Sequence, residues 1–163
     1  MKTASVYFYV QRNSTFARAY TPIVFDLAVV NEGNAMNLNS GKFIAPLTGK
    51  YFFSFTGSAK FPSPSSLPSS VQLGIFLRLN GSKFGSGWVE ESNSVSNQSS
   101  PITLQSTLNL KSGDQVWVQI DHKSPEAYLY DDDYHHTHFT GFMMEEEIFA
   151  SVGQNDAQND TQN

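Results

Sequence analysis

The run Tyr130–His138 holds the densest group of side chains that could do chemistry. It reads Tyr-Asp-Asp-Asp-Tyr-His-His-Thr-His, so phenols, carboxylates and imidazoles lie within one short segment. Three carboxylates favour a hard cation such as calcium. His136 and His138 would share one face of an extended strand, which suits zinc, copper or nickel. The segment predicts a site for calcium or another divalent metal, and the alternative is a solvated acidic loop with surface histidines. The predicted metal ligands are Asp131, Asp132, Asp133, His136 and His138.

Aromatic side chains beside polar loop residues form a second candidate site. A sugar stacks on an aromatic ring while polar neighbours bind its hydroxyls. The predicted ligand-binding residues are Trp88, Tyr128, Tyr130, Tyr134 and His135. For Trp88, plain packing is an equally open interpretation. An acidic sugar would also need a cation, and His135 is one of several candidate suppliers.

The clustered histidines also predict a response to pH. An unperturbed imidazole has a pKa of about 6.5, so mild acid would charge this loop. We expect that charge to weaken assembly or ligand binding, and the adjacent aspartates to reduce the effect.

No catalytic motif is present in the sequence. The chain has no cysteine, which excludes a thiol nucleophile. It has no Gly-x-Ser-x-Gly motif, and the glycine-rich run Phe84–Gly87 lacks the Lys that follows in a phosphate-binding loop. The sequence therefore predicts a binding protein rather than an enzyme.

The charge balance limits the partners. Asp and Glu number 15 against 10 Lys and Arg, for a net charge of -5, and no basic cluster occurs. Nucleic-acid binding requires a basic stripe, so we exclude it as the main function. The longest apolar stretch, Ile23–Val30, contains Asp26 and is far shorter than the roughly 20 residues that span a bilayer. We therefore expect no membrane insertion.

Strand signals recur along the chain and helix signals are nearly absent, which favours an all-β sandwich or barrel. In the clearest strand, Val71–Leu79, apolar residues occupy every second position, and the Asn-Gly pair that follows is typical of a hairpin. The other expected strands are Val6–Val10, Ile23–Val30, Lys42–Ala45, Lys50–Ser58, Leu104–Leu110, Val116–Ile120, Tyr128–Tyr130 and His138–Ile148.

The length of 163 residues suits one domain. We expect that domain to span residues 1–150 and to be followed by a flexible polar tail over residues 151–163. The Pro- and Ser-rich run Phe61–Ser70 and the polar run Glu90–Ser100 are expected to be loops.

Two of the expected strands are apolar on both faces. Ile23–Val30 and Tyr51–Phe55 do not alternate as antiparallel strands with one wet face do. Their second face needs cover, and the chain has no helix to supply it. We expect another subunit to cover it, and cover by a loop of the same chain is the alternative.

Three motifs, in order along the chain, resemble those of the complement C1q globular-head family. The first comprises Phe25, Asn31, Phe43, Gly49, Tyr51, Phe53 and Phe55. Its large apolar position, usually aromatic or Leu in the family, is Met36, an adaptable core residue. The second is the segment Leu108–Trp117, and the third is Phe139–Phe142.

This resemblance implies a ten-stranded, two-sheet jelly roll similar to tumour necrosis factor, assembled as a homotrimer and secreted. The chain lacks a collagen repeat, so it is similar to the head-only members of the family, some of which bind sugars or microbial surfaces. A residue of Tyr130–His138 would form a three-fold ring if it lay at the apex of a trimer. Calcium sites of the family lie near a loop that here, at Glu90–Ser100, has no Asp.

We expect an extracellular, non-enzymatic recognition module that binds carbohydrate or microbial surfaces as a lectin does. Two alternatives stay open. One is a signalling ligand that binds a protein receptor. The other is a structural or mineral-associated matrix protein, suggested by the acidic loop.

Overall fold

The computed structural model describes residues 5–62 and 70–148. In this part the chain forms strands and no helix. The strands are β1 (Tyr7–Gln11), β2 (Leu27–Glu32), β3 (Phe43–Ile44), β4 (Gly49–Phe61), β5 (Ser70–Leu79), β6 (Ser82–Ser92), β7 (Gln98–Leu110), β8 (Gln115–Lys123), β9 (Tyr128–Leu129) and β10 (His138–Glu146). The expected tail and most of the expected loop Phe61–Ser70 lie outside the described residues.

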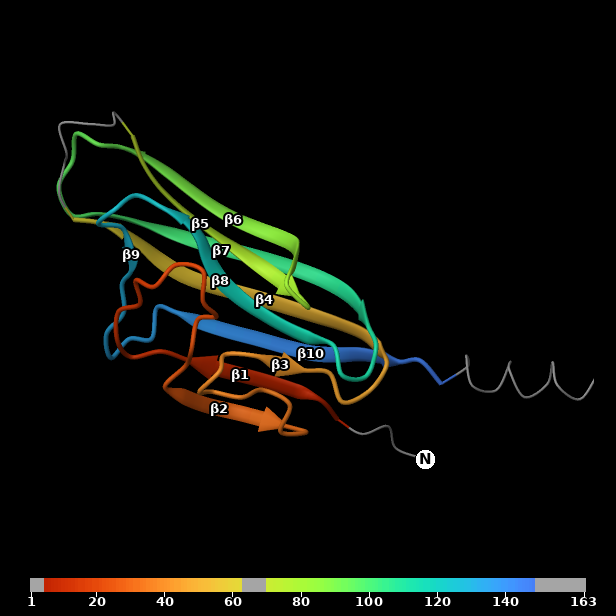
Figure 1. Cartoon of the computed structure of the whole chain (residues 1–163). Coiled ribbons are helices and arrows are strands. Elements are labelled where there is room, and N and C mark those ends of the chain that lie inside the picture. Colours follow the sequence, from red (N-terminus) through yellow and green to blue (C-terminus); the bar gives the residue numbers. More distant parts are fainter. Residues whose placement is uncertain (1–4, 63–69, 149–163) are drawn as a thin grey trace, which may run out of the picture.

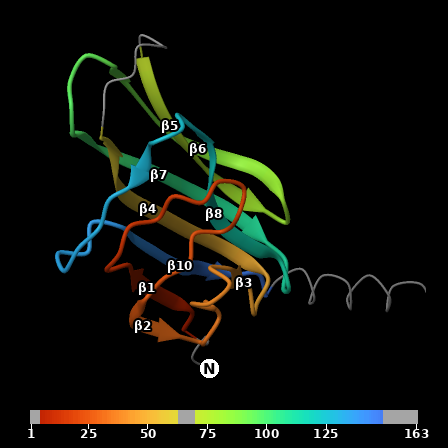
Figure 2. The ribbon, with the colours of Figure 1, turned by 60° about the vertical axis from the view of Figure 1, so that its left-hand side comes forward.

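The strands build two antiparallel sheets that pack face to face (Figures 1 and 2). A six-stranded sheet has the order β2-β1-β10-β4-β7, and β9 pairs with one end of β4. A four-stranded sheet has the order β3-β8-β5-β6. The predicted all-β, ten-stranded, two-sheet jelly roll is confirmed.

Large aromatic side chains fill the space between the sheets. Tyr51, Phe53 and Phe55 are fully buried on one face of β4, as their alternate spacing predicts. Gly141 lies opposite Phe53 on β10, and a Cβ there would come within 2.7 Å of the Phe53 ring and 2.6 Å of the Phe8 ring. A larger residue at this position would therefore push β10 away from the strands packed against it.

Three predicted elements differ from the structure. The strand expected at Ile23–Val30 begins only at Leu27. The backbone N–H of Ile23 bonds to Val118 of β8 and that of Phe25 to Leu38, and both side chains fill the core. The expected loop Glu90–Ser100 is mostly strand. Residues 90–92 belong to β6 and residues 98–100 to β7, and Gln98 and Ser100 donate hydrogen bonds to the Glu91 carboxylate between the two strands.

The Asn80–Gly81 pair forms the predicted hairpin turn, since Leu79 pairs with Ser82, but the strand that follows it, β6, was not among the expected strands. Its inward positions include Gly85 and Gly87, which carry no side chain, so the alternation typical of a strand is absent from the sequence. Gly87 is required by close approach, since a Cβ there would lie 2.3 Å from the carbonyl oxygen of Thr103.

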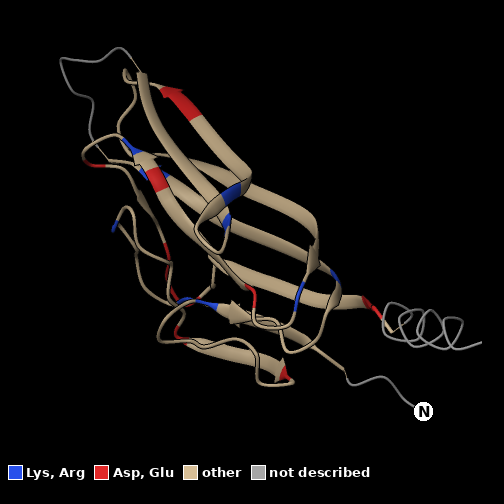
Figure 3. Ribbon diagram, turned by 45° about the vertical axis from the view of Figure 1, so that its right-hand side comes forward, with Lys and Arg blue, Asp and Glu red and all other residues tan. Residues whose placement is uncertain are grey.

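Charged residues are dispersed over the described surface. Figure 3 shows Lys and Arg mixed with Asp and Glu, and no basic stripe follows the strands in this view. Within residues 5–62 and 70–148, no helix is long and apolar enough to cross a membrane.

Candidate ligand-binding sites

The loop between β9 and β10 is held in place by one buried carboxylate. Asp131 is only 5% exposed. Its Oδ1 accepts hydrogen bonds of 2.8 Å from the backbone N–H groups of Asp132 and His136, and its Oδ2 accepts one of 2.8 Å from Thr137. The side chain predicted to bind a metal is therefore occupied by the backbone of its own loop.

Asp132 organises the exposed half of the loop. It accepts hydrogen bonds from the Tyr130 hydroxyl at 3.0 Å and from the Tyr134 backbone N–H at 2.8 Å, and its Oδ1 lies 3.1 Å from Nε2 of His136. The bond from the Tyr134 backbone is the main cause that lowers the pKa of Asp132. The same carboxylate, as acceptor, raises the pKa of Tyr130.

The remaining loop residues have different surroundings. Asp133 is exposed. Nδ1 of His135 lies 2.8 Å from the Arg12 carbonyl oxygen, which fastens the loop to the end of β1. The His138 ring meets the Tyr9 ring edge-on at 5.7 Å, and burial is the main cause that lowers the pKa of His138.

Within the described residues, no group of three His, Asp or Glu side chains is placed to hold a metal ion. His136 lies before β10 rather than on it, so it does not share a strand face with His138 as the spacing suggests.

Four of the predicted residues line one polar pocket of about 500 Å³. Tyr134, His135, His136 and His138 form one wall of it. The rest of the lining comes from β4 and β7 and includes the hydroxyl-bearing residues Thr56, Ser58 and Ser99. Its residues are Thr56, Gly57, Ser58, Ser99, Ser100 and Pro101. Imidazoles and hydroxyls both donate and accept hydrogen bonds, and the Tyr134 side chain is 84% exposed beside them.

The other predicted aromatic residues lie outside this pocket. Tyr130 contacts the His136 ring at 5.7 Å and lies under the Lys60 ammonium at 4.5 Å. Tyr128 is half-buried where β9 pairs with Lys60. Trp88 lies on β6 of the other sheet, so the structure does not bring it together with the loop.

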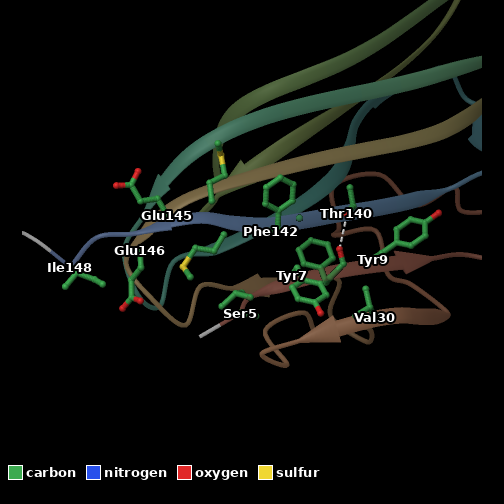
Figure 4. A pocket seen from close by; sticks show the side chains of 14 residues that line it. Ser5, Tyr7, Tyr9, Val30, Thr140, Phe142, Glu145, Glu146 and Ile148 are labelled. Carbon is green, nitrogen blue, oxygen red and sulfur yellow. Dashed lines mark hydrogen bonds between the residues drawn. The ribbon is translucent and has the colours of Figure 1, made fainter. Parts of the chain in front are cut away.

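A second, apolar groove of about 820 Å³ shares the outer face of the six-stranded sheet with the polar pocket. His138, Thr140 and Phe142 alternate along β10, so they all turn away from the core. Figure 4 shows Tyr7, Tyr9 and Phe142 along this groove, with Glu145 and Glu146 at one end. Tyr7 is 42%, Phe142 43% and Met144 57% exposed. The described part of the chain therefore leaves an extended apolar surface uncovered.

Trp88 is the one predicted ligand-binding residue that lies on the four-stranded sheet. Its indole stacks on the imidazole of His122, with ring centroids 4.9 Å and ring planes 23° apart. His122 was not predicted from the sequence, because nothing there indicates that β6 and β8 flank the same glycine of β5.

Comparisons with known proteins agree with this architecture. The profile described as "C1q domain" matches residues 7–144. Complement C1q tumor necrosis factor-related protein 2 of Mus musculus is 30% identical over 146 residues, which are 90% of this chain and 44% of that protein. Complement C1q and tumor necrosis factor-related protein 9A of Homo sapiens is 30% identical over 80% of this chain and 35% of that protein. The chain thus spans less than half the length of these curated relatives.

A solved structure with the same fold is the globular domain of zebrafish complement 1qA protein. It superimposes with a TM-score of 0.66 at 21% identity, covering 87% of this chain and 99% of that one.

Proposed function

Because this chain belongs to the C1q domain family, we propose that it is an extracellular, non-enzymatic recognition module that assembles as a homotrimer and binds carbohydrate on microbial surfaces. The polar pocket between the β9–β10 loop and strands β4 and β7 is the observation that carries the ligand assignment. Extracellular location is part of the same proposal and rests on the family.

Assembly is supported by the outer face of the six-stranded sheet. Exposed apolar side chains contiguous along β1 and β10 are typical of a surface that another protein covers. The face includes Phe52 of β4, one of the residues whose apolar spacing predicts cover by a second subunit. Three copies of the chain would also give three equivalent ligand sites.

Carbohydrate binding is supported by the chemistry of the pocket walls. Tyr134 offers an exposed ring for the C–H face of a sugar. His136, His138, Ser58 and Ser99 line the same pocket. A single site of this kind binds weakly, but three linked sites raise the apparent affinity by orders of magnitude on a repetitive surface.

Metal binding remains a prediction that depends on assembly. If the loop lies at the apex of a trimer, one histidine from each chain would form a three-fold ring, and imidazole nitrogens suit zinc or another transition metal. Calcium is less well supported, since Asp131 is engaged by the loop backbone. Titration calorimetry of the assembled protein with zinc and with calcium measures both, and the absence of heat with either metal would contradict the prediction.

A glycan array probed with the labelled, assembled protein tests the proposed function. We expect binding to a defined subset of glycans, and weaker binding to that subset in the variants Tyr134→Ala and His136→Ala. Tyr20→Ala is the matched control, because Tyr20 is 74% exposed and does not line the pocket. If the assembled protein binds no glycan, the alternative of a ligand for a protein receptor is favoured.

A further inference from the structure

Trp88 is held in a fixed position on the outer face of the four-stranded sheet. Gly74 of β5 pairs with Trp88 on one side and with His122 of β8 on the other, so the three residues form one row across three strands. A Cβ on Gly74 would lie 2.4 Å from Cε3 and Cζ3 of the indole. The glycine therefore lets the benzo edge of the indole rest on the backbone, and the His122 imidazole stacks against the ring.

The Gly74 backbone and the His122 ring cover only part of the indole. Trp88 remains 47% exposed, on the face of the sheet opposite the core. An aromatic ring that is fixed by its neighbours and still open to solvent loses little conformational entropy when it binds a ligand. The row Trp88–Gly74–His122 thus presents a preorganised stacking surface.

The groups beside the indole are hydrogen-bonding rather than cationic. Two residues from Trp88 along β6, on the same face of the sheet, lie Glu90 on one side and Ser86 on the other. The exposed Glu90 pairs with Gln72 of β5. A carboxylate accepts hydrogen bonds from sugar hydroxyls and repels an acidic sugar.

The cations of this sheet have other partners. The Arg78 guanidinium lies 2.6 Å from the Asp121 carboxylate, and the Lys83 ammonium lies 4.7 Å above the Phe76 ring. The Lys42 ammonium likewise lies 4.6 Å above the Trp117 ring. The charge distribution therefore favours a neutral ligand at Trp88.

We infer that Trp88, His122 and Glu90 form a subsite for one neutral hexopyranose. The C–H face of the sugar stacks on the indole, and its hydroxyls donate hydrogen bonds to the Glu90 carboxylate. This inference rests on the proposed carbohydrate-binding function and specifies neutral hexopyranoses as a class of ligand. It assigns that ligand to a site on the opposite sheet from the β9–β10 loop.

Tryptophan fluorescence of the full chain tests the subsite, since Trp88 and Trp117 are the two tryptophans. In a Trp117→Phe variant the indole signal comes from Trp88 alone. Titration with the methyl glycosides of mannose, galactose, glucose and N-acetylglucosamine is expected to give a saturable change with one of them. A site that contacts a single sugar ring binds in about the millimolar range.

Variants separate this subsite from the polar pocket. We expect Trp88→Ala, followed by sugar-detected NMR, to raise Kd at least about tenfold. His122→Ala and Glu90→Gln should weaken binding without removing the indole, which covers the case in which Trp88→Ala is misfolded. Tyr134→Ala should leave this binding unchanged.

Three results would overturn the inference. The first is no saturable change with any neutral glycoside. The second is glycoside binding that survives all three substitutions and is lost in Tyr134→Ala, which would keep the proposed function and place its ligand in the polar pocket. The third is tighter binding of methyl glucuronide or N-acetylneuraminic acid than of every neutral sugar.

Discussion

The phenyl rings of Phe52 and Phe142 lie opposite each other on β4 and β10, with centroids 5.4 Å apart, on the face of the six-stranded sheet that turns away from the core. This pair is part of the apolar face to which we assign self-assembly. Phe142 is 43% exposed in the single chain, so a charge placed there is tolerated by the isolated fold but not in a buried interface.

We expect Phe142→Glu to convert the assembled protein into a monomer. Light scattering should then give the chain mass of 18.1 kDa rather than about three times that value. Phe84→Glu is the matched control, because Phe84 is 51% exposed on β6 of the other sheet. Equal masses for wild type and Phe142→Glu would contradict the assignment of this face.

The buried carboxylate of Asp131 is expected to stabilise the fold. Asp131→Ala removes the acceptor of three backbone N–H groups, and we expect it to lower the free energy of unfolding by about 3 kcal/mol. Asp133→Ala, at an exposed position of the same loop, should change it by less than about 0.5 kcal/mol. Urea unfolding measures both, and a similar effect of the two substitutions would refute the role given to Asp131.

Gly141 is expected to tolerate no side chain. Gly141→Ala places a methyl group against the rings of Phe8 and Phe53, and we expect a loss of stability of about 2 kcal/mol. Gly85→Ala tests the same chemical change on a strand where the nearest atom would be 3.9 Å away. Thermal unfolding should show a lower Tm for Gly141→Ala only.

Acidification is expected to destabilise the fold through His138. Burial lowers the pKa of His138 in the folded chain, and the nearby Asp131 carboxylate only partly opposes this. The unfolded chain therefore binds a proton more readily, starting at a pH near the ordinary value of about 6.5. The contribution to stability is present above that pH and is lost as the pH falls towards the lower, folded-state pKa.

The measurement is the urea midpoint of wild type and of His138→Gln at about pH 7.5 and about pH 5.5. We expect the decrease between the two pH values to be smaller in the variant. The other three histidines are present in both proteins, so the comparison isolates the effect of His138. An equal decrease in both proteins would exclude His138 as the source.

The core of the fold was predictable because its residues alternate. Tyr51, Phe53 and Phe55 appear at every second position, and that period alone assigns them to one buried face. Strand β6 was missed for the opposite reason. Gly85 and Gly87 occupy inward positions of β6 without a side chain, so the strand shows no apolar alternation. Gly87 is required because Thr103 of another strand packs close to it, and the sequence gives no local signal of that contact.

The candidate sites were predictable only in part. Composition indicated the loop Tyr130–His138, and four of its residues do line a pocket. Asp131 accepts hydrogen bonds from backbone N–H groups whereas Asp133 faces solvent, and the sequence gives no signal that separates these two environments. The pairing of Trp88 with His122 depends on the register of three strands, and that register is fixed by long-range contacts.

The position of β10 has a consequence for biosynthesis. This strand is the last of the described strands in the chain, yet it lies between β1 and β4 in the middle of the six-stranded sheet. Tyr7 near the start of β1 pairs with Phe142 on β10, so β1 has no partner on that side until residues 138–146 have left the ribosome. The nascent chain must therefore keep an unpaired, partly apolar edge on β1 while residues 12–137 are synthesised, and chaperones that shield strand edges during synthesis would act in that interval.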